Sequence, residues 1–323
     1  MAFFGIRFDF RNPPFAATSM TDRYRAGLDM AEWAERLGFV TIVLSEHHGS
    51  PDGYLPSPLV MAAAIAARTT TINIRVSAIV APLWDPVRLA EEAAVVDLLS
   101  GGRLHLDLAN GYVAGEFAMF DVPLRERARR TTRAMELLRA ARSGDAIEVD
   151  GRSMVITPAP GRDGPGLALG GSSAAAAQRA ARIADGFTPS LPEHWEHYRA
   201  ARIELGHADP GPHFPTALQQ FHLATDVEQG WADVGAFMLH ETNAYGAWMR
   251  DAGLEGMYDT AADVESVRAS GFYRVLTPDM MIDQLTAAGP YAFVLFHPLM
   301  GGIPPEMAWS SLHLFEHEVL PRL

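Results

Sequence analysis

The chain has 323 residues, of which 48% are apolar and 20% charged, so it is long enough for one large α/β barrel or two ordinary domains and too apolar for a disordered chain. Its 26 basic and 39 acidic residues give a net charge of −13, which disfavours nucleic acid and anionic membranes as principal partners. The sequence contains no cysteine and no lysine, which excludes thiol catalysis, disulfides, iron–sulfur clusters, Schiff bases and a P-loop lysine.

The first third of the chain alternates between strand-like and helix-like segments. Strands are predicted at residues 5–10, 39–44, 72–80 and 104–108, and helices from Thr21 or Asp22 to Leu37, over 59–68 and from Asp85 to Leu99. Two of these helices begin with N-cap and proline signals at Ser57-Pro58 and Asp85-Pro86, and glycines end helices at Gly38 and Gly101-Gly102. Such alternation predicts right-handed βαβ units and a parallel sheet.

Parallel βαβ units suit either an open doubly wound sheet or a closed barrel. A dinucleotide-binding sheet should carry a glycine-rich turn after its first strand, whereas this turn reads Asp9-Phe10-Arg11-Asn12-Pro13. We therefore predict a (β/α)8 TIM barrel that forms a single domain over residues 1–323.

The rest of the chain adds insertions to this predicted barrel. An arginine-rich helix is predicted over residues 124–143, followed by a β-hairpin near 147–156 that turns at Asp150-Gly151. Further strands are predicted at residues 167–169, 187–190, 216–224 and 291–296, and further helices at 174–184, 278–288 and 305–321. Residues 226–275 are helical in part and too long for a simple crossover, so we expect a lid-like region there.

The run Glu46-His47-His48 follows the second predicted strand, at the end where parallel barrels keep their active sites. These histidines could hold a metal, move protons or cap a strand, and Glu46 could accept from a nearby backbone N–H. Successive side chains of a strand point to opposite faces, so only one of the two histidines can face the interior, and a His-x-His metal pair is absent. Asp9, His222 and His297 stand near the ends of other strands, but no convergent carboxylate–histidine group is evident, and we expect no metal site.

A second candidate site is the run Gly170-Gly171-Ser172-Ser173, which leads into a predicted helix. Glycines permit close backbone approach, and a helix N-terminus with hydroxyl groups favours a phosphate. The alternative is an ordinary helix cap, since serine is a preferred N-cap residue in any helix.

Several stretches of the chain together resemble the bacterial luciferase-like monooxygenase family, whose members are flavin or deazaflavin enzymes on a (β/α)8 barrel. The stretches are Glu46-His47-His48, 78–82, Asp85-Pro86-Val87-Arg88, Glu91-Glu92-Ala93, 97–103, Gly111-Tyr112, Glu116-Phe117, 170–173, 182–187 and 312–315. Their order and spacing extend over nearly the whole chain.

The resemblance implies roles for individual residues. His47 matches a catalytic pocket histidine that faces flavin and substrate as an acid/base or hydrogen-bond donor, and Ser77–Ala78 matches a non-prolyl cis peptide under the isoalloxazine ring. The remaining expected cofactor-binding residues are Asn110, Tyr112, Gly171, Ser172 and Ser173. Asn110 stands where bacterial luciferase has an arginine on the phosphate, so either another arginine supplies the charge or the cofactor binds differently.

The activity implied is that of a flavin-dependent monooxygenase that takes reduced FMN from a separate reductase and uses O2 to oxidise a small organic substrate. No glycine-rich NAD(P)H fingerprint is visible, which fits a two-component system. An F420-dependent hydride-transfer enzyme is the alternative, although its polyglutamyl tail would require a basic groove that a net charge of −13 disfavours. A metal-dependent hydrolase barrel and a non-catalytic flavin-binding protein are further alternatives.

The expected setting is cytoplasmic and soluble, because the sequence shows neither a signal peptide nor an apolar run that could span a membrane. The resemblance implies a homodimer. In the lid-like region, Trp231, Phe237, Tyr245 and Trp248 either shape the substrate site or pack the helices.

Overall fold

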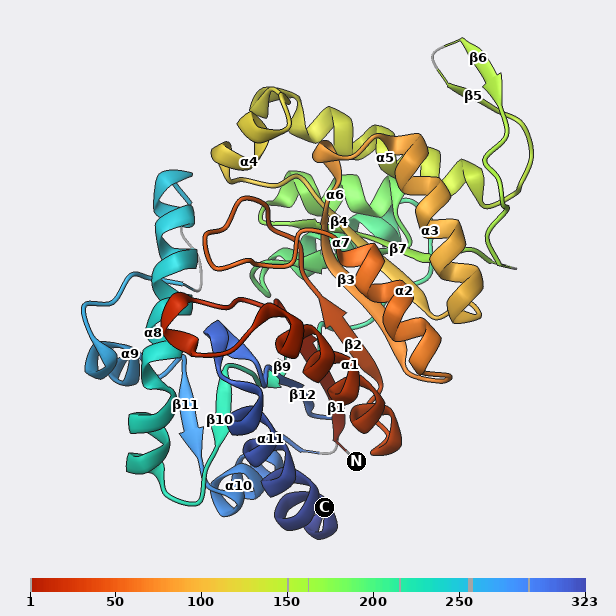
Figure 1. The fold of residues 1–323 in the computed structure, drawn as a ribbon. Coiled ribbons are helices and arrows are strands. Elements are labelled where there is room, and N and C mark those ends of the chain that lie inside the picture. Colours follow the sequence, from red (N-terminus) through yellow and green to blue (C-terminus); the bar gives the residue numbers. More distant parts are fainter. Residues whose placement is uncertain (1, 150, 162, 215, 255–257, 290) are drawn as a thin grey trace. The chain divides into compact units, whose positions relative to one another are not determined.

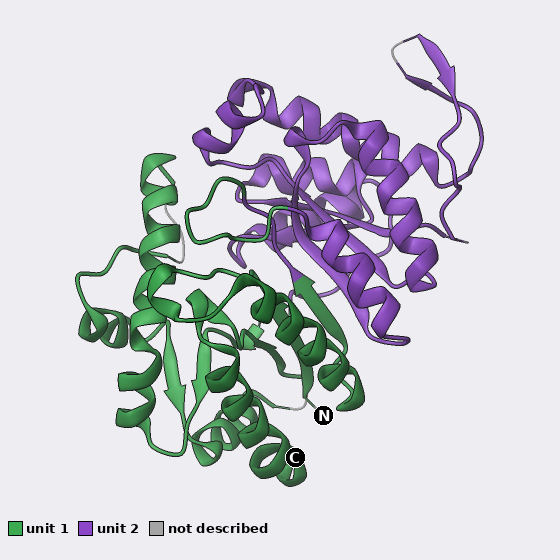
Figure 2. Ribbon diagram, viewed as in Figure 1, with its two compact units in different colours: residues 1–43, 48–56, 214–323 green, residues 44–47, 57–213 purple. Residues whose placement is uncertain are grey.

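The computed structural model describes residues 2–149, 151–161, 163–214, 216–254, 258–289 and 291–323 (Figure 1). Contacts divide the chain into two compact units, which Figure 2 shows in separate colours. The first unit comprises Met1–Val43, His48–Pro56 and Phe214–Leu323, and the second comprises Leu44–His47 and Ser57–His213.

One sheet contains eight strands in the order β8-β7-β4-β3-β2-β1-β12-β9. Their bounds are β1 Phe3–Phe8, β2 Thr41–Leu44, β3 Asn73–Val80, β4 Leu104–Ala109, β7 Gly166–Gly171, β8 Gly186–Pro189, β9 Thr216–Leu218 and β12 Phe293–Phe296. The pairs β1–β12, β12–β9, β3–β4, β4–β7 and β7–β8 are parallel. The predicted eight-stranded parallel sheet is confirmed. Because β8 and β9 end the order, the described residues show no closed barrel.

The first unit surrounds an aromatic core. Its helices are α1 Met20–Arg36, α8 Val227–Asp251, α9 Val264–Ser270, α10 Pro278–Ala288 and α11 Pro305–Leu314. Phe4 of β1 and Phe296 of β12 both pack on Phe315, with ring centroids 5.0 and 4.8 Å apart. These rings and Phe39 are buried, so alternate residues of the strands and the end of the terminal helix share one apolar core.

The strand predicted at residues 216–224 is interrupted in this unit. β9 ends at Leu218, and a separate strand β10 (Phe221–Leu223) pairs in parallel with β11 (Arg274–Leu276). Between them Gln220 has a φ of 52°, which breaks the extended backbone that a continuous strand requires.

The second unit carries helices α2 Pro58–Arg68, α3 Pro86–Ser100, α4 Ala114–Met119, α5 Arg127–Ala141, α6 Ala174–Ile183 and α7 His194–Glu204. The predicted hairpin is present as β5 (Ile147–Val149) and β6 (Arg152–Met154), and it projects away from the helices of its unit in Figure 1. Its second strand begins earlier than expected because Val149 pairs with Arg152. Of the predicted turn residues, Asp150 lies outside the described residues.

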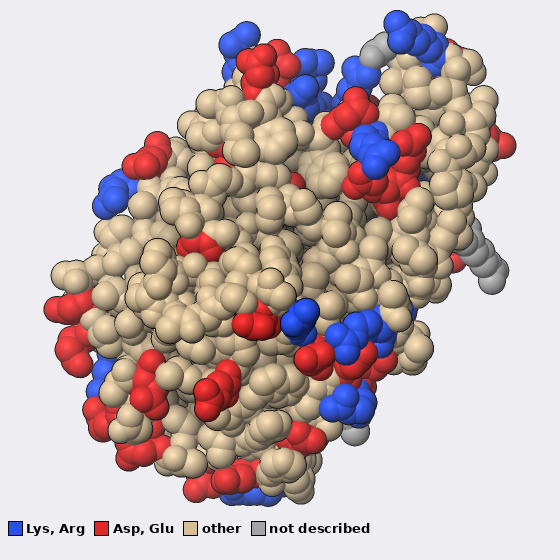
Figure 3. Space-filling view, in the orientation of Figure 1, with Lys and Arg blue, Asp and Glu red and all other residues tan. Residues whose placement is uncertain are grey.

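Charged side chains are mixed on the molecular surface. On the face drawn in Figure 3, arginines occur in small groups beside acidic side chains. Among the described residues, every helix is too short or too polar to cross a bilayer.

Candidate active site

His47 comes shortly after β2 and is buried in the second unit. Its Nδ1 lies 2.7 Å from Oε1 of Glu116, a buried side chain of α4. The Tyr112 ring meets the His47 ring edge-on, with centroids 5.9 Å apart. A carboxylate on one imidazole nitrogen fixes the orientation of the ring and leaves the other nitrogen available for proton transfer. This pair can therefore serve as an acid or base.

Glu46 supports the neighbouring backbone. Its Oε2 accepts from the backbone N–H of Val80 at 2.6 Å, and its Oε1 accepts from Nε1 of Trp84 at 2.9 Å. The structure thus agrees with the plainer interpretation of Glu46, as an acceptor for a nearby backbone N–H.

Strand β3 contains the peptide bond that the resemblance singled out. The bond between Ser77 and Ala78 is cis, as expected, and the pairing of β3 with β4 shifts register between Ser77 and Ile79. The hydroxyl of Ser45 donates to the carbonyl oxygen of Ser77 at 3.2 Å. The expected geometry is confirmed, while contact of these residues with a flavin stays a prediction.

An arginine reaches Asn110, the residue that follows β4. Nη2 of Arg179, on α6, donates to Oδ1 of Asn110 at 3.2 Å. Burial lowers the pKa of Arg179, and the neighbouring Arg182 lowers it further. Helix α6 therefore places a guanidinium beside Asn110, and its contact with a cofactor phosphate stays a prediction.

The glycine–serine run forms the start of α6. Oγ of Ser173 accepts from the backbone N–H of Ala176 at 3.2 Å, so Ser173 is the N-cap of this helix. A Cβ on Gly171 would lie 2.5 Å from Cβ of Ala176, so no side chain fits there. Ser172 and Ser173 are exposed. The cap interpretation is confirmed for Ser173, and phosphate binding stays a prediction.

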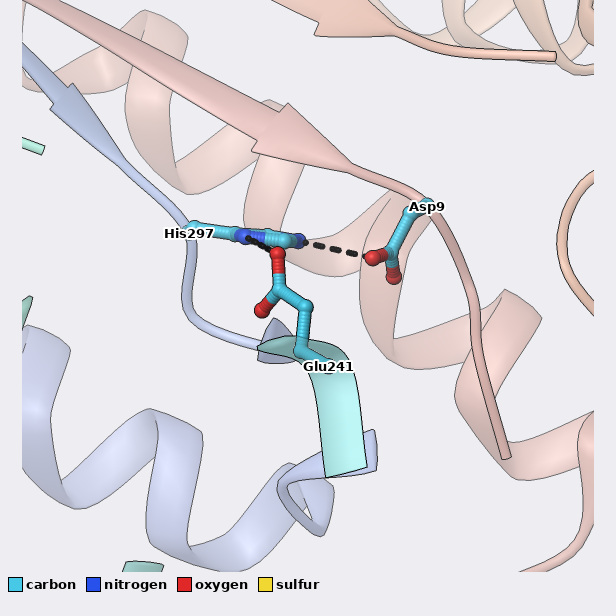
Figure 4. Close-up of side chains that lie close together, drawn as sticks. All are labelled: Asp9, Glu241 and His297. Carbon is cyan, nitrogen blue, oxygen red and sulfur yellow. Dashed lines mark ion pairs between the residues drawn. The ribbon is translucent and has the colours of Figure 1, made fainter. Parts of the chain in front are cut away.

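A second group of buried polar residues lies within the first unit (Figure 4). Asp9 follows β1, His297 follows β12 and Glu241 belongs to α8. Nε2 of His297 is 3.3 Å from Oδ2 of Asp9, and its Nδ1 is 3.8 Å from Oε1 of Glu241. In contrast to the expectation from sequence, the fold does bring a carboxylate–histidine group together.

Charged and aromatic groups surround Asp9. Burial alone would raise the pKa of this carboxyl group, but His297, and then Arg11 and Arg7, lower it to about 2. The guanidinium of Arg11 also holds Oδ2 of Asp52 at 2.6 Å. It lies 4.7, 4.8 and 4.9 Å from the ring centroids of Tyr54, Tyr245 and Trp248. Two of the predicted lid aromatics, Tyr245 and Trp248, thus pack around a buried arginine.

Three contacts in these sites were not predicted from the sequence. Glu116 belongs to a stretch that resembles the family, but nothing in the pattern assigned it to His47. Arg179 is one of many arginines, and its contact with Asn110 depends on how α6 packs. Glu241 has no flanking motif, so only the folded chain reveals its approach to His297.

The fold is a parallel α/β sheet, and polar side chains follow the carboxyl ends of its strands. This arrangement is typical of α/β enzymes. The chain belongs to the luciferase-like monooxygenase family, because the sequence model of this family matches residues 3–291.

Named relatives agree with this family. The FMNH2-dependent dimethylsulfone monooxygenase of Pseudomonas putida is 25% identical over 69% of this chain and 66% of its own length. The oxygenase component of the flavin-dependent trigonelline monooxygenase of Acinetobacter baylyi is 33% identical over 29% of this chain and 26% of its own length. The match extends over 38%, 42% and 64% of the lengths of three other curated relatives, so the chain spans less than two thirds of each.

Solved structures share the fold. Monooxygenase RslO1 from Streptomyces bottropensis superposes with a TM-score of 0.77 and 23% identity, covering 99% of each chain. An F420-dependent secondary alcohol dehydrogenase in complex with an F420–acetone adduct gives a TM-score of 0.68 and 15% identity, covering 94% of this chain and 97% of that one. At these identities the likeness concerns the fold alone.

Proposed function

We propose that the protein is a flavin-dependent monooxygenase that uses reduced FMN, delivered by a separate reductase, and O2 to oxidise a small organic substrate. The observation that carries the proposal is the buried His47–Glu116 pair, which lies in the same compact unit as the cis peptide Ser77–Ala78 and the Asn110–Arg179 contact. Buried acid/base groups and an anion-binding helix start are what a reduced flavin with a phosphate requires.

The second unit offers suitable donors for the FMN phosphate. Backbone N–H groups at the start of α6 and the exposed hydroxyls of Ser172 and Ser173 can donate to phosphate oxygens. Arg179 adds a positive charge, and within the described part of the chain its buried Nε has no hydrogen-bond partner. The absence of a side chain at Gly171 lets the start of α6 pack closely on β7, because a Cβ there would lie 2.5 Å from Cβ of Ala176. These groups match a dianionic phosphate.

His47 is the proposed proton carrier. Bound reduced FMN supplies the two electrons with which O2 is activated. Glu116 holds Nδ1 of His47, so we assign proton exchange with the substrate to Nε2. Tyr112 restricts the ring from its edge, and together the three residues keep one imidazole orientation.

Reduced F420 is the alternative cofactor, and hydride transfer the alternative reaction. The F420-dependent dehydrogenase has the same fold, which supports that alternative only at the level of architecture. The relative named as FMNH2-dependent is aligned over most of this chain and supports FMN. The name of the Acinetobacter relative, an oxygenase component, supports a separate reductase as partner.

The proposed assembly is a cytoplasmic homodimer. Helices α2 and α3 expose large apolar side chains that a partner could cover, namely Val60, Val95, Leu98 and Leu99. Light scattering of the purified protein measures the assembly, and a monomer at micromolar concentration would contradict it.

Anaerobic equilibrium binding tests the choice of cofactor. Purified protein is titrated with reduced FMN and, separately, with reduced F420. The proposal predicts one-to-one binding of reduced FMN with the lower dissociation constant. Tighter binding of F420, without protein-dependent oxygen uptake, would replace the monooxygenase with the hydride-transfer enzyme.

A further inference from the structure

We propose that Asp9, Glu241 and His297 bind one divalent transition-metal ion within the first unit. The proposal goes beyond the flavin reaction and concerns a different set of residues, all in the first unit. It rests on the geometry of three buried side chains and on the hydrogen bonds that fix the tautomer of His297.

The three side chains are buried away from solvent. Asp9 and Glu241 are each 0% exposed and His297 is 2% exposed. One potential ligand atom from each lies within 4.8 Å of the others (Figure 4). Asp9 and His297 follow neighbouring paired strands, and Glu241 is held by helix α8. Asp9 already lies beside Nε2 of His297, whereas the carboxylate of Glu241, nearest to Nδ1, must turn to reach an ion bound at Nε2.

The amide of Gln220 fixes which nitrogen of His297 carries hydrogen. Nε2 of Gln220 donates to Oε1 of Glu241 at 3.0 Å, so the amide oxygen of Gln220 faces His297. That oxygen, which can only accept, is 3.4 Å from Nδ1 of His297. Nδ1 therefore carries a hydrogen, and Nε2 is the nitrogen that faces Asp9, either with a second proton or with a lone pair that can bind a metal.

In the neutral ring this nitrogen faces the carboxylate of Asp9 as a second acceptor. Nε2 of His297 lies 3.3 Å from Oδ2 of Asp9, and two acceptors at this distance repel unless a cation lies between them. Among the described residues, neither atom has a hydrogen-bond partner, nor does Oε2 of Glu241. Ligands about 2.0–2.2 Å from a tetrahedral metal are separated by about 3.3–3.6 Å, which matches the 3.3 Å between Nε2 of His297 and Oδ2 of Asp9.

The donor set selects the class of ion. One imidazole nitrogen and two carboxylate oxygens suit Zn2+, Co2+, Mn2+ or Fe2+, whereas Mg2+ and Ca2+ prefer oxygen ligands alone. Two carboxylates balance the charge of a divalent ion. The guanidinium of Arg11 lies 3.6 Å from Oδ2 of Asp9 as well as 2.6 Å from Oδ2 of Asp52, and Arg7 donates to the hydroxyl of Tyr245, so both charges oppose a second cation beside Asp9. We therefore expect micromolar rather than nanomolar affinity.

Metal titration of the full-length protein tests the proposal. After treatment with a chelator and dialysis, the protein is titrated with Zn2+ by calorimetry and with Co2+ by visible absorption. We expect one ion per chain, and binding at least roughly tenfold weaker in Asp9→Asn, Glu241→Gln and His297→Gln. X-ray absorption of the Zn2+-loaded wild type should show one imidazole and oxygen ligands, and it keeps the test decisive where a variant fails to fold.

The exposed pair His313 and His317 on the terminal helix is the obvious competing site, with ring centroids 6.0 Å apart. The matched control His313→Gln should leave Zn2+ binding unchanged. Three results would overturn the proposal. They are loss of Zn2+ binding in this control, wild-type affinity in all three cluster variants, and no uptake of Zn2+ or Co2+ by the wild type. The last result would mean that a proton, not a metal, separates His297 from Asp9.

Discussion

At the scale of single residues, the run Glu46-His47-His48 divides into different roles. Strand alternation predicted that one histidine faces inward, and His47 is buried whereas His48 is half-buried. Glu46 is occupied by Val80 and Trp84. The strand period limited the choice to one histidine, and the family resemblance selected His47. The sequence could not select Glu116, whose contact with His47 joins residues far apart in the chain.

Replacing His47 tests its role as a proton carrier. We predict that His47→Ala lowers turnover by roughly 10²–10⁴-fold with an intact fold, because the acid/base group is lost. Glu116→Gln should lower turnover by a smaller factor, because the amide holds the imidazole orientation less firmly than the carboxylate does. Steady-state kinetics with circular dichroism as a folding control measures both. Wild-type turnover in His47→Ala would remove the residue from the mechanism.

Arg179 provides a test specific to the cofactor phosphate. A hydrogen bond to a charged group contributes about 1.5–3 kcal/mol, so Arg179→Gln should weaken binding of FMN by about 10–100-fold. Binding of riboflavin, which has no phosphate, should change little. The exposed neighbour Arg182 offers a matched control, since Arg182→Gln should preserve both affinities. If Arg179→Gln leaves the ratio of FMN affinity to riboflavin affinity unchanged, Arg179 does not contact the phosphate.

At the scale of elements, the strand–helix order was predictable because caps, prolines and glycines act locally. Most boundaries differ by one or two residues, and the N-cap of α1 is Ser19, with its side chain bonded to Asp22, in place of Thr21 or Asp22. The break at Gln220 was not predictable, because its left-handed φ carries no sequence signal in a residue other than glycine. The lid-like role of α8 and α9 stays a prediction.

Two predicted caps allow a matched comparison. Asp85 accepts from the backbone N–H groups of Val87 and Arg88 at 3.0 Å each, whereas Ser57 makes no side-chain cap hydrogen bond. Asp85→Ala should therefore lower the free energy of unfolding by about 1 kcal/mol, and Ser57→Ala by much less. Urea denaturation measures both. Equal losses would show that the capping geometry does not decide stability here.

At the scale of the whole molecule, the parallel sheet and the position of His47 near a strand end could be predicted, because parallel α/β folds place active sites at the carboxyl ends of their strands. The acidic cluster of the first unit could not, because Asp9, Glu241 and His297 come from three elements widely separated in sequence. Local sequence patterns also could not determine whether the sheet closes into a barrel. Local periodicity counts strands, but it does not determine whether the first and last strands pair.

Stability should depend on pH through His222. Burial lowers the pKa of this imidazole to about 4, although Asp233 acts in the opposite direction. The unfolded chain, with an ordinary histidine pKa of about 6.5, then binds the proton more readily, so stability falls as the pH is lowered from 6.5 towards 4. The loss from this group is about 3 kcal/mol. Denaturation midpoints between pH 4 and 8 should show this slope, and His222→Gln should flatten it; an identical slope would exclude His222 as its source.

The proposed monooxygenase must bind reduced FMN and direct its reaction with O2. The most direct test mixes the anaerobic complex of protein and reduced FMN with oxygenated buffer and follows flavin oxidation by stopped-flow absorbance. We predict that oxidation of the bound flavin differs in rate from that of free reduced FMN and changes again in His47→Gln. Oxidation at the rate of free reduced FMN in wild type and variant alike would contradict the account.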